Sequence, residues 1–287
     1  MGAAAAAGGA GSVRAAPILR AIPSSKETLP VIGLGTWQTF DVGAGGDRAP
    51  LREILRRFVE LGGRVIDSSP MYGRAETVVG DLAAALRVRD KLFVATKVWT
   101  SGRERGIAQM EESLRRLRVE QIDLMQVHNL VDWRTHLQTL AEWKRTGRVR
   151  YVGVTHYTAS AYGDLEQVIK GERLDFVQLN YSPIERDAER RLLPLAIDRG
   201  VAVLVNRPFA EGALFRRLRG AALPAWAAEL GCRTWAQLVL KWIAAHPAVT
   251  CVIPATSRPE HLEDNMQAGV GALPDAAARD RIAALLA

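Results

Sequence analysis

The fold of this chain is decided by residues 65–73, Val65-Ile66-Asp67-Ser68-Ser69-Pro70-Met71-Tyr72-Gly73, where a short apolar run ends in a carboxylate. Two later apolar runs also end in a functional side chain, Lys97 after residues 92–96 and His128 after residues 122–127. If these runs are successive parallel strands, Asp67, Tyr72, Lys97 and His128 gather at the carboxyl ends of the strands. In a barrel of alternating strands and helices, active sites lie on this face. The stretch therefore predicts an enzyme.

Strand-length apolar runs alternate with longer amphipathic segments along the chain. The run 201–205 is continuously apolar, as a parallel strand covered on both faces should be. Glycines follow several amphipathic segments and mark helix ends, because glycine tolerates positive φ. We expect strands at Val31–Leu34, Arg64–Asp67, Leu92–Lys97, Ile122–Val127, Val149–Val154, Asp175–Leu179, Val201–Val205 and Thr250–Ile253. We expect helices near residues 47–62, 74–87, 103–118, 133–147, 158–171, 187–199, 234–246 and 258–270.

Eight such repeats within about 250 residues predict an α/β fold, a (β/α)8 TIM barrel, in a single domain over residues 17–287. Three segments lie outside the repeat. We expect a hairpin across the barrel floor over residues 17–30, an insertion between the seventh strand and its helix over residues 212–233, and a short helix over Asp275–Leu286. Residues 1–16 are rich in alanine and glycine, and we expect them to be disordered.

The composition argues against several classes of protein. No run approaches the roughly 18 apolar residues that a membrane span needs, and the first residues lack the features of a signal peptide. We therefore expect a cytoplasmic location, with the periplasm as the alternative if an export signal was removed before residue 1. The net charge is +7, but the arginines are scattered over amphipathic segments, so we expect solvated helix faces and no nucleic-acid partner. Cys232 and Cys251 show no metal-binding spacing, and we expect no metal.

Short motifs from about residue 30 onward have the order and spacing of one known family. They are Gly33-Leu34-Gly35-Thr36-Trp37, the stretch 65–73, Thr96-Lys97-Val98-Trp99, Ser113-Leu114 followed by Ile122-Asp123-Leu124 and His128, the run 147–154, the run 177–183, and Val252-Ile253-Pro254 leading to Asn265. With these motifs the chain resembles the aldo-keto reductase family. The resemblance implies a TIM barrel, a nicotinamide cofactor and the reduction of aldehydes, with ketones as further candidates, to alcohols.

The resemblance implies catalytic roles for Asp67, Tyr72, Lys97 and His128, and elementary chemistry agrees. A free tyrosine has a pKa of about 10, and the Lys97 ammonium should lower it. Asp67 can accept a hydrogen bond from Lys97 and hold it oriented. His128 can donate a hydrogen bond to the carbonyl oxygen, while Tyr72 protonates the developing alkoxide as general acid. The hydride must come from a cofactor, since no side chain can deliver one.

The cofactor site has neither of the common nucleotide motifs, because the chain contains no GxGxxG after a strand and no P-loop. A barrel can instead hold phosphate in the loops after its seventh and eighth strands. By resemblance, Gln178 would hold the nicotinamide amide and Asn265 would lie near the adenine. Arg258 favours NADPH, with NADH as the alternative, because a guanidinium can bind a 2′-phosphate through two hydrogen bonds. The expected cofactor-binding residues are Thr36, Trp37, Thr155, His156, Gln178, Asn206, Arg207, Pro208, Phe209, Thr256, Ser257, Arg258 and Asn265.

Some positions depart from the family pattern. Asn206 stands where many members have a tyrosine stacked on the nicotinamide, and Thr155-His156 replaces a Ser-Asn pair. Ala255 and His261 replace a lysine and an arginine that are common in the last cofactor motif. These differences concern the cofactor site and leave the four catalytic positions intact.

The substrate pocket is expected to be lined by Trp37, Trp99, Asn129 and Trp133, beside Tyr72 and His128. Such an aromatic wall favours an apolar or aromatic aldehyde, and small dicarbonyls also fit. We expect a monomer whose partner is a small carbonyl compound. Two alternatives remain, a nicotinamide-binding regulatory or sensor subunit with slow or no turnover, and a lyase that uses Lys97 as a Schiff-base nucleophile.

Overall fold

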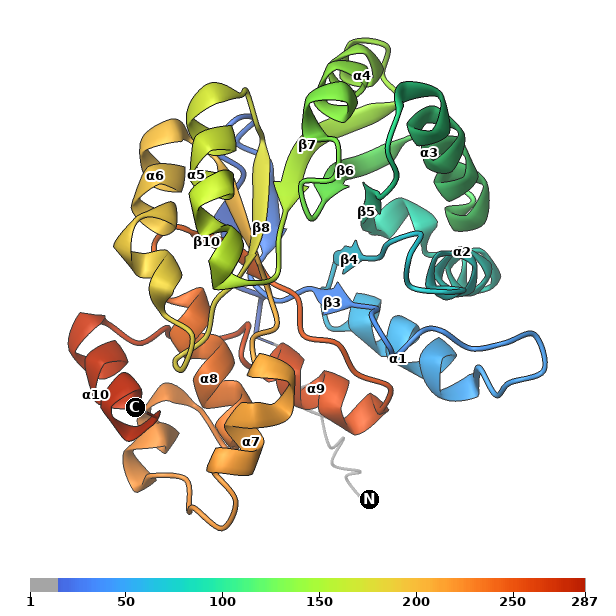
Figure 1. Ribbon diagram of the computed structural model, residues 1–287. Coiled ribbons are helices and arrows are strands. Elements are labelled where there is room, and N and C mark those ends of the chain that lie inside the picture. The colour runs from blue at the N-terminus through green and yellow to red at the C-terminus, as the bar shows by residue number, and fades with distance from the viewer. Residues whose placement is uncertain (1–14, 287) are drawn as a thin grey trace, which may run out of the picture.

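Eight parallel strands form one sheet whose hydrogen-bonded order follows the chain from β3 to β10 (Figure 1). The computed structural model describes residues 15–286. The sheet closes between its first and last strands, where Ile32 pairs with Val252 and Gly35 pairs with Ala255 in parallel bridges. The strands are β3 (Leu34–Gly35), β4 (Val65–Asp67), β5 (Phe93–Val98), β6 (Ile122–His128), β7 (Val149–Thr155), β8 (Phe176–Asn180), β9 (Ala202–Asn206) and β10 (Val249–Val252).

A helix follows each strand and covers the outside of the barrel, which confirms the predicted (β/α)8 fold. The first of them buries residues three and four apart, Leu51, Ile54, Leu55 and Phe58, as a helix with one apolar face does. The helices of the repeat are α1 (Ala49–Glu60), α2 (Ala75–Leu86), α3 (Arg103–Leu117), α4 (Trp133–Arg145), α5 (Tyr162–Gly171), α6 (Leu192–Arg199), α8 (Trp235–Ala244) and α9 (Pro259–Gln267). The predicted insertion contains α7 (Ala213–Arg217), and the predicted terminal helix is α10 (Ala276–Leu286).

The predicted hairpin closes the floor of the barrel. Its strands β1 (Leu19–Ala21) and β2 (Thr28–Pro30) pair antiparallel, and Leu29 is buried in the same cluster as the inward-facing side chains of the barrel. The Tyr151 hydroxyl donates to Glu27 over 2.8 Å, which ties the hairpin turn to β7. The hairpin therefore covers the amino ends of the strands, opposite the ends that carry the predicted catalytic residues.

Two element boundaries differ from the sequence prediction. The helix expected from residue 187 begins at Leu192, because Pro194 has no N–H and its ring clashes with the carbonyl four residues earlier in a longer helix. The strand expected at Val31–Leu34 is reduced to β3. Its earlier residues bond instead across the barrel closure, where the Gly33 N–H donates to the Val252 carbonyl oxygen over 2.8 Å.

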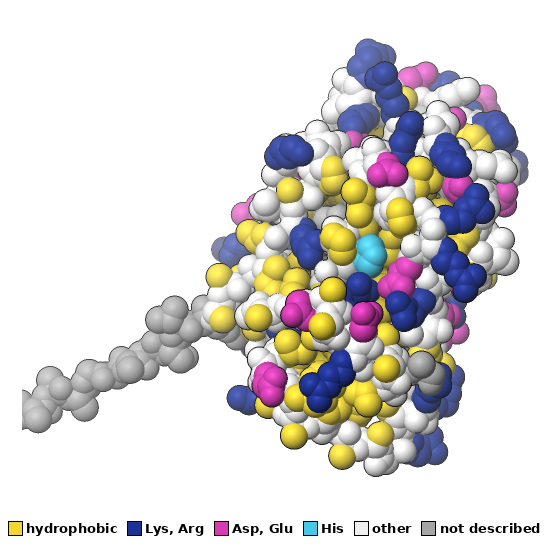
Figure 2. All heavy atoms as spheres, turned by 90° about the vertical axis from the view of Figure 1, so that its left-hand side faces the viewer, with side chains coloured by type: hydrophobic (Ala, Val, Ile, Leu, Met, Phe, Trp, Pro, Cys, Tyr) yellow, Lys and Arg dark blue, Asp and Glu magenta, His cyan; other side chains and the backbone are white. Residues whose placement is uncertain are grey.

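The surface carries its positive charge in dispersed form. On the face shown in Figure 2, Lys and Arg side chains alternate with Asp and Glu. On helix α1, Arg56 pairs with both Glu53 and Glu60. Within residues 15–286, no helix is both long enough and apolar enough to cross a bilayer. The disorder expected over residues 1–16 falls outside the described residues, apart from Ala15 and Ala16.

Candidate active site

The four side chains predicted to be catalytic lie together at the carboxyl ends of β4, β5 and β6. Asp67 is the last residue of β4, and Lys97 is the penultimate residue of β5. Lys97 Nζ donates to Asp67 Oδ2 over 2.6 Å and lies 4.9 Å from the centre of the Tyr72 ring. The rings of Tyr72 and His128 meet edge to face with 5.9 Å between their centroids. The structure thus brings together all four residues that the sequence singled out.

Lys97 is a fully buried ammonium. Burial disfavours its charged form, but the interactions with Asp67, whose charge contributes most, and with the Tyr72 hydroxyl outweigh burial and raise the pKa of Lys97 above its ordinary value. A second hydrogen bond of 2.7 Å runs from Nζ to the Ser68 carbonyl oxygen. A Schiff-base lysine needs a free amine with a lowered pKa, so this environment argues against the lyase alternative.

Tyr72 keeps its proton more firmly than the sequence alone indicated. Burial raises the pKa of the Tyr72 phenol, and the opposing effect of the Lys97 charge is smaller. The Lys97 charge acts in the expected direction, but burial outweighs it and the net change in the pKa of Tyr72 is upward. The phenol is protonated throughout the neutral range and is available as a proton donor.

His128 is a neutral imidazole. Burial is the main cause that lowers the pKa of His128 to about 2, and the charges of Lys97 and His156 act in the same direction. Its Nδ1 lies 3.0 Å from Ser69 Oγ. A neutral ring has one donor nitrogen and one acceptor nitrogen, so His128 can donate a single hydrogen bond to an oxygen atom in the site.

Gln126 is a residue of the site that sequence reasoning missed. Its Nε2 donates to Asp67 Oδ1 over 3.2 Å, and Gln178 Nε2 donates to the same oxygen over 2.9 Å. A signal for it exists in the sequence, because side chains two residues apart share a face of a strand and Gln126 precedes His128 by two. An amide at an inward position of a largely apolar strand indicates a polar partner inside the barrel.

The residues expected to hold the nicotinamide end of a cofactor are joined around Gln178. Its Oε1 accepts hydrogen bonds from Thr155 Oγ1 over 3.2 Å and from Asn206 Nδ2 over 3.3 Å. The Asn206 Oδ1 atom is buried and has no partner within residues 15–286. Buried polar atoms are normally hydrogen-bonded, so this oxygen fits an N–H donor of a ligand such as a carboxamide.

His156 stands next to this group at the end of β7. Its Nδ1 accepts the backbone N–H of Tyr157 over 3.0 Å and that of Thr158 over 3.3 Å. Since Nδ1 is an acceptor, a neutral His156 carries its proton on Nε2. The Tyr157 ring stacks on the His156 ring with 5.4 Å between centroids. His156 thus has a ring N–H donor at the position where the family pattern has an asparagine.

The remaining expected cofactor residues lie in three places. Thr36 and Trp37 follow β3, and Thr36 Oγ1 donates to the Asp67 carbonyl oxygen over 2.9 Å. Arg207, Pro208 and Phe209 follow β9, and Arg207 Nη1 donates to the Tyr157 carbonyl oxygen over 2.7 Å. A last group lies at the amino end of α9 and within it: Thr256, Ser257, Arg258 and Asn265. The Arg258 side chain is exposed and bonded to Glu260, with Nε 2.6 Å from the carboxylate.

Aromatic side chains extend from the loops around the four predicted catalytic residues. Trp37 and Trp99 are 41% and 42% exposed, and the Trp99 ring lies 6.4 Å from the His128 ring. Trp133 begins α4. Asn129 has a φ of 52° and a buried Oδ1 without a partner within the described chain. Positive φ at a residue other than glycine is strained and occurs often at functional sites.

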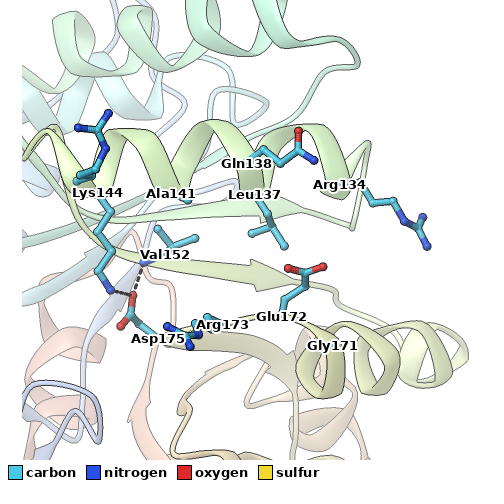
Figure 3. Close-up of a pocket in the computed structure, with 11 residues that line it drawn as sticks. Arg134, Leu137, Gln138, Ala141, Lys144, Val152, Gly171, Glu172, Arg173 and Asp175 are labelled. Carbon is cyan, nitrogen blue, oxygen red and sulfur yellow. Dashed lines mark hydrogen bonds and ion pairs between the residues drawn. The ribbon is translucent and has the colours of Figure 1, made fainter.

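A cavity of about 730 Å³ lies elsewhere, on the outside of the barrel between α4 and the end of α5. Figure 3 shows the Lys144–Asp175 ion pair at one end of this cavity. None of the four predicted catalytic residues lines this cavity. Asp175 precedes β8 and so lies at the opposite end of the strands from Gln178. This cavity is separate from the candidate active site.

Comparison with known proteins identifies the family of this chain. The model of the Aldo/keto reductase family matches residues 31–282. The chain belongs to this family. Methylglyoxal reductase YeaE of Escherichia coli is 30% identical over 257 residues, covering 84% of this chain and 86% of that protein. The family assignment confirms an oxidoreductase.

Solved structures of the family share the fold. An aldo-keto reductase from Klebsiella pneumoniae in complex with NADP and acetate gives a TM-score of 0.76 at 26% identity, covering 91% of this chain and 93% of that one. Aldo-keto reductase AKR11C1 from Bacillus halodurans gives a TM-score of 0.79 at 24% identity, covering 95% and 97%. The second likeness is evidence of the fold alone.

Replacing Lys97 by methionine should lower the free energy of unfolding by about 3–5 kcal/mol, because the Asp67 carboxylate remains buried without its ammonium partner. Urea unfolding followed by circular dichroism measures the change. The double variant Lys97→Met/Asp67→Asn removes both charges and keeps an acceptor for Gln126 and Gln178. It should recover most of the loss, and a double variant no more stable than Lys97→Met would contradict the explanation.

Proposed function

We propose that the protein is an NADPH-dependent reductase that converts aldehydes to alcohols, with ketones as further candidate substrates. The observation that carries this proposal is the buried Asp67–Lys97 pair beside the Tyr72 phenol and the His128 imidazole. The reductase name of the Escherichia coli relative and the NADP complex of the Klebsiella relative support it.

In the proposed reaction, the carbonyl oxygen lies between Tyr72 and His128. A ring nitrogen of His128 donates a hydrogen bond to this oxygen and stabilises its growing negative charge. Tyr72 transfers its phenolic proton to the same oxygen as general acid. Lys97, held by Asp67, stabilises the phenolate that remains. NADPH, when bound, supplies the hydride that adds to the carbonyl carbon.

The cofactor residues divide into two groups in this proposal. Asn206, His156, Gln178 and Thr155 hold the carboxamide end, because their hydrogen-bonded chain leads to Asp67 and leaves Asn206 Oδ1 free for a donor. The phosphate and adenine end is held by the loops after β9 and β10 and by α9. The residues are Arg207, Pro208, Phe209, Thr256, Ser257, Arg258 and, within α9, Asn265. Thr36 and Trp37 border the cofactor, and Trp37, Trp99, Asn129 and Trp133 line the substrate pocket.

Replacing Tyr72 by phenylalanine should lower kcat for aldehyde reduction by about 10²–10⁴-fold, because the general acid is lost. NADPH oxidation at 340 nm with aromatic, aliphatic and dicarbonyl aldehydes measures it, and NADPH fluorescence titration should show nearly unchanged binding. Tyr151→Phe is the matched control, since its hydroxyl bonds to the barrel floor. Unchanged turnover in Tyr72→Phe contradicts the mechanism. If the wild type binds NADPH and reduces none of these aldehydes, the sensor alternative is favoured.

The kcat/KM for aldehyde reduction should be nearly independent of pH from about 5 to 9. Tyr72 acts in its protonated form and its pKa is raised above 10, so activity falls only as pH rises through that pKa. His128 acts as a neutral ring and its pKa is about 2, so it produces no loss of activity as pH falls from 9 to 5. Measuring kcat/KM across this range tests both residues. A limb centred near pH 6.5 would contradict the neutral state of His128.

Replacing Arg258 by glutamine should raise the Kd for NADPH by about 10- to 100-fold and leave the Kd for NADH nearly unchanged, because the guanidinium is proposed to bind the 2′-phosphate. Fluorescence titration with both cofactors measures this. Glu260→Gln is the complementary variant, since Glu260 competes for Arg258. Glu260→Gln should lower the Kd for NADPH. If both variants changed the Kd for NADPH and the Kd for NADH equally, the proposed contact of Arg258 with the 2′-phosphate would be contradicted.

A further inference from the structure

Ser69 contacts both proton-donating residues of the proposed mechanism. It is fully buried in the turn that follows β4. Its Oγ lies 3.0 Å from His128 Nδ1, and its carbonyl oxygen accepts the backbone N–H of Tyr72 over 3.0 Å. The turn that positions Tyr72 therefore also holds the His128 ring.

The direction of the Ser69–His128 hydrogen bond follows from the other partner of the hydroxyl. The backbone N–H of Met71 donates to Ser69 Oγ over 3.3 Å, so the oxygen already accepts one hydrogen bond. The hydroxyl hydrogen then needs an acceptor, and His128 Nδ1 is the one recorded for it within residues 15–286. If Nδ1 carried a proton, this buried hydroxyl hydrogen would have no partner, which is costly. Ser69 therefore donates to Nδ1.

We propose that Ser69 is a positioning residue that fixes the tautomer of His128 with its proton on Nε2. A neutral imidazole whose Nδ1 accepts a hydrogen bond must carry its proton on Nε2. With this tautomer, Nε2 donates to a carbonyl oxygen. The opposite tautomer would present a lone pair to that oxygen and repel it. The inference rests on the proposed function, because it assigns the ring a donor role toward the carbonyl substrate.

The tautomer can be observed without substrate or cofactor. The chain has five histidines, so long-range ¹⁵N–¹H correlation spectra of labelled protein are simple, and the His128→Gln variant assigns the His128 signals. In the wild type, His128 should show a protonated Nε2 and a hydrogen-bonded Nδ1. In Ser69→Ala, the Nδ1 signal should shift and the Nδ1–H tautomer should become populated. For aldehyde reduction, kcat/KM should fall about tenfold, the size of one hydrogen bond to the transition state.

Two further variants separate this role from a packing defect. Ser69→Thr restores a hydroxyl and should recover the wild-type His128 spectrum and most of kcat/KM. Ser68→Ala removes the neighbouring buried hydroxyl, which bonds to Thr36, and should leave the His128 spectrum unchanged. A His128 spectrum in Ser69→Ala identical to that of the wild type overturns the inference, as does a changed spectrum with unchanged kcat/KM. Absence of reductase activity in the wild type would instead count against the proposed function, since the tautomer is read independently.

Discussion

The ion pair between Asp67 and Lys97 is the interaction on which the rest of the site depends. Both side chains are buried, and a buried charge pair is tolerated only when its remaining hydrogen-bonding capacity is satisfied. Here the Ser68 carbonyl oxygen accepts from Lys97, while Gln126 and Gln178 donate to Asp67. The pair therefore links four strands of the barrel, β4, β5, β6 and β8, through polar side chains that all point inward.

The same pair acts on the protonation of its neighbours alongside burial, which is the larger cause of the pKa shift at both His128 and Tyr72. At His128, burial and the Lys97 charge both lower the pKa, so the imidazole is neutral. At Tyr72, burial raises the pKa and the Lys97 charge opposes it, so the phenol ionises more easily than burial alone would allow. A neutral ring can donate a hydrogen bond without transferring a proton, and a phenol beside an ammonium can release one. The two residues thus differ in their chemistry although they are neighbours in one site.

The cofactor side of the site explains how departures from the family pattern can be accommodated. Asn206 does not provide an aromatic ring, but its amide joins Gln178 and leaves one buried oxygen without a partner. His156 holds its Nδ1 on two backbone N–H groups, which leaves a donor nitrogen in the position of an asparagine. At these two positions an amide replaces an aromatic ring and an imidazole replaces an amide, so both positions carry hydrogen-bonding groups.

The sequence by itself determined the barrel and the four clustered side chains, because strand and helix periodicity repeats along the chain and the ends of parallel strands meet at one face. It did not determine the start of α6, where the ring of Pro194 limits the helix, or the raised pKa of Tyr72. Nor did it reveal that Gln126 hydrogen-bonds to Asp67 or that Ser69 hydrogen-bonds to His128. Burial, hydrogen-bond direction and the balance of opposing charges depend on atoms brought together from distant parts of the chain, so only the tertiary structure decided them.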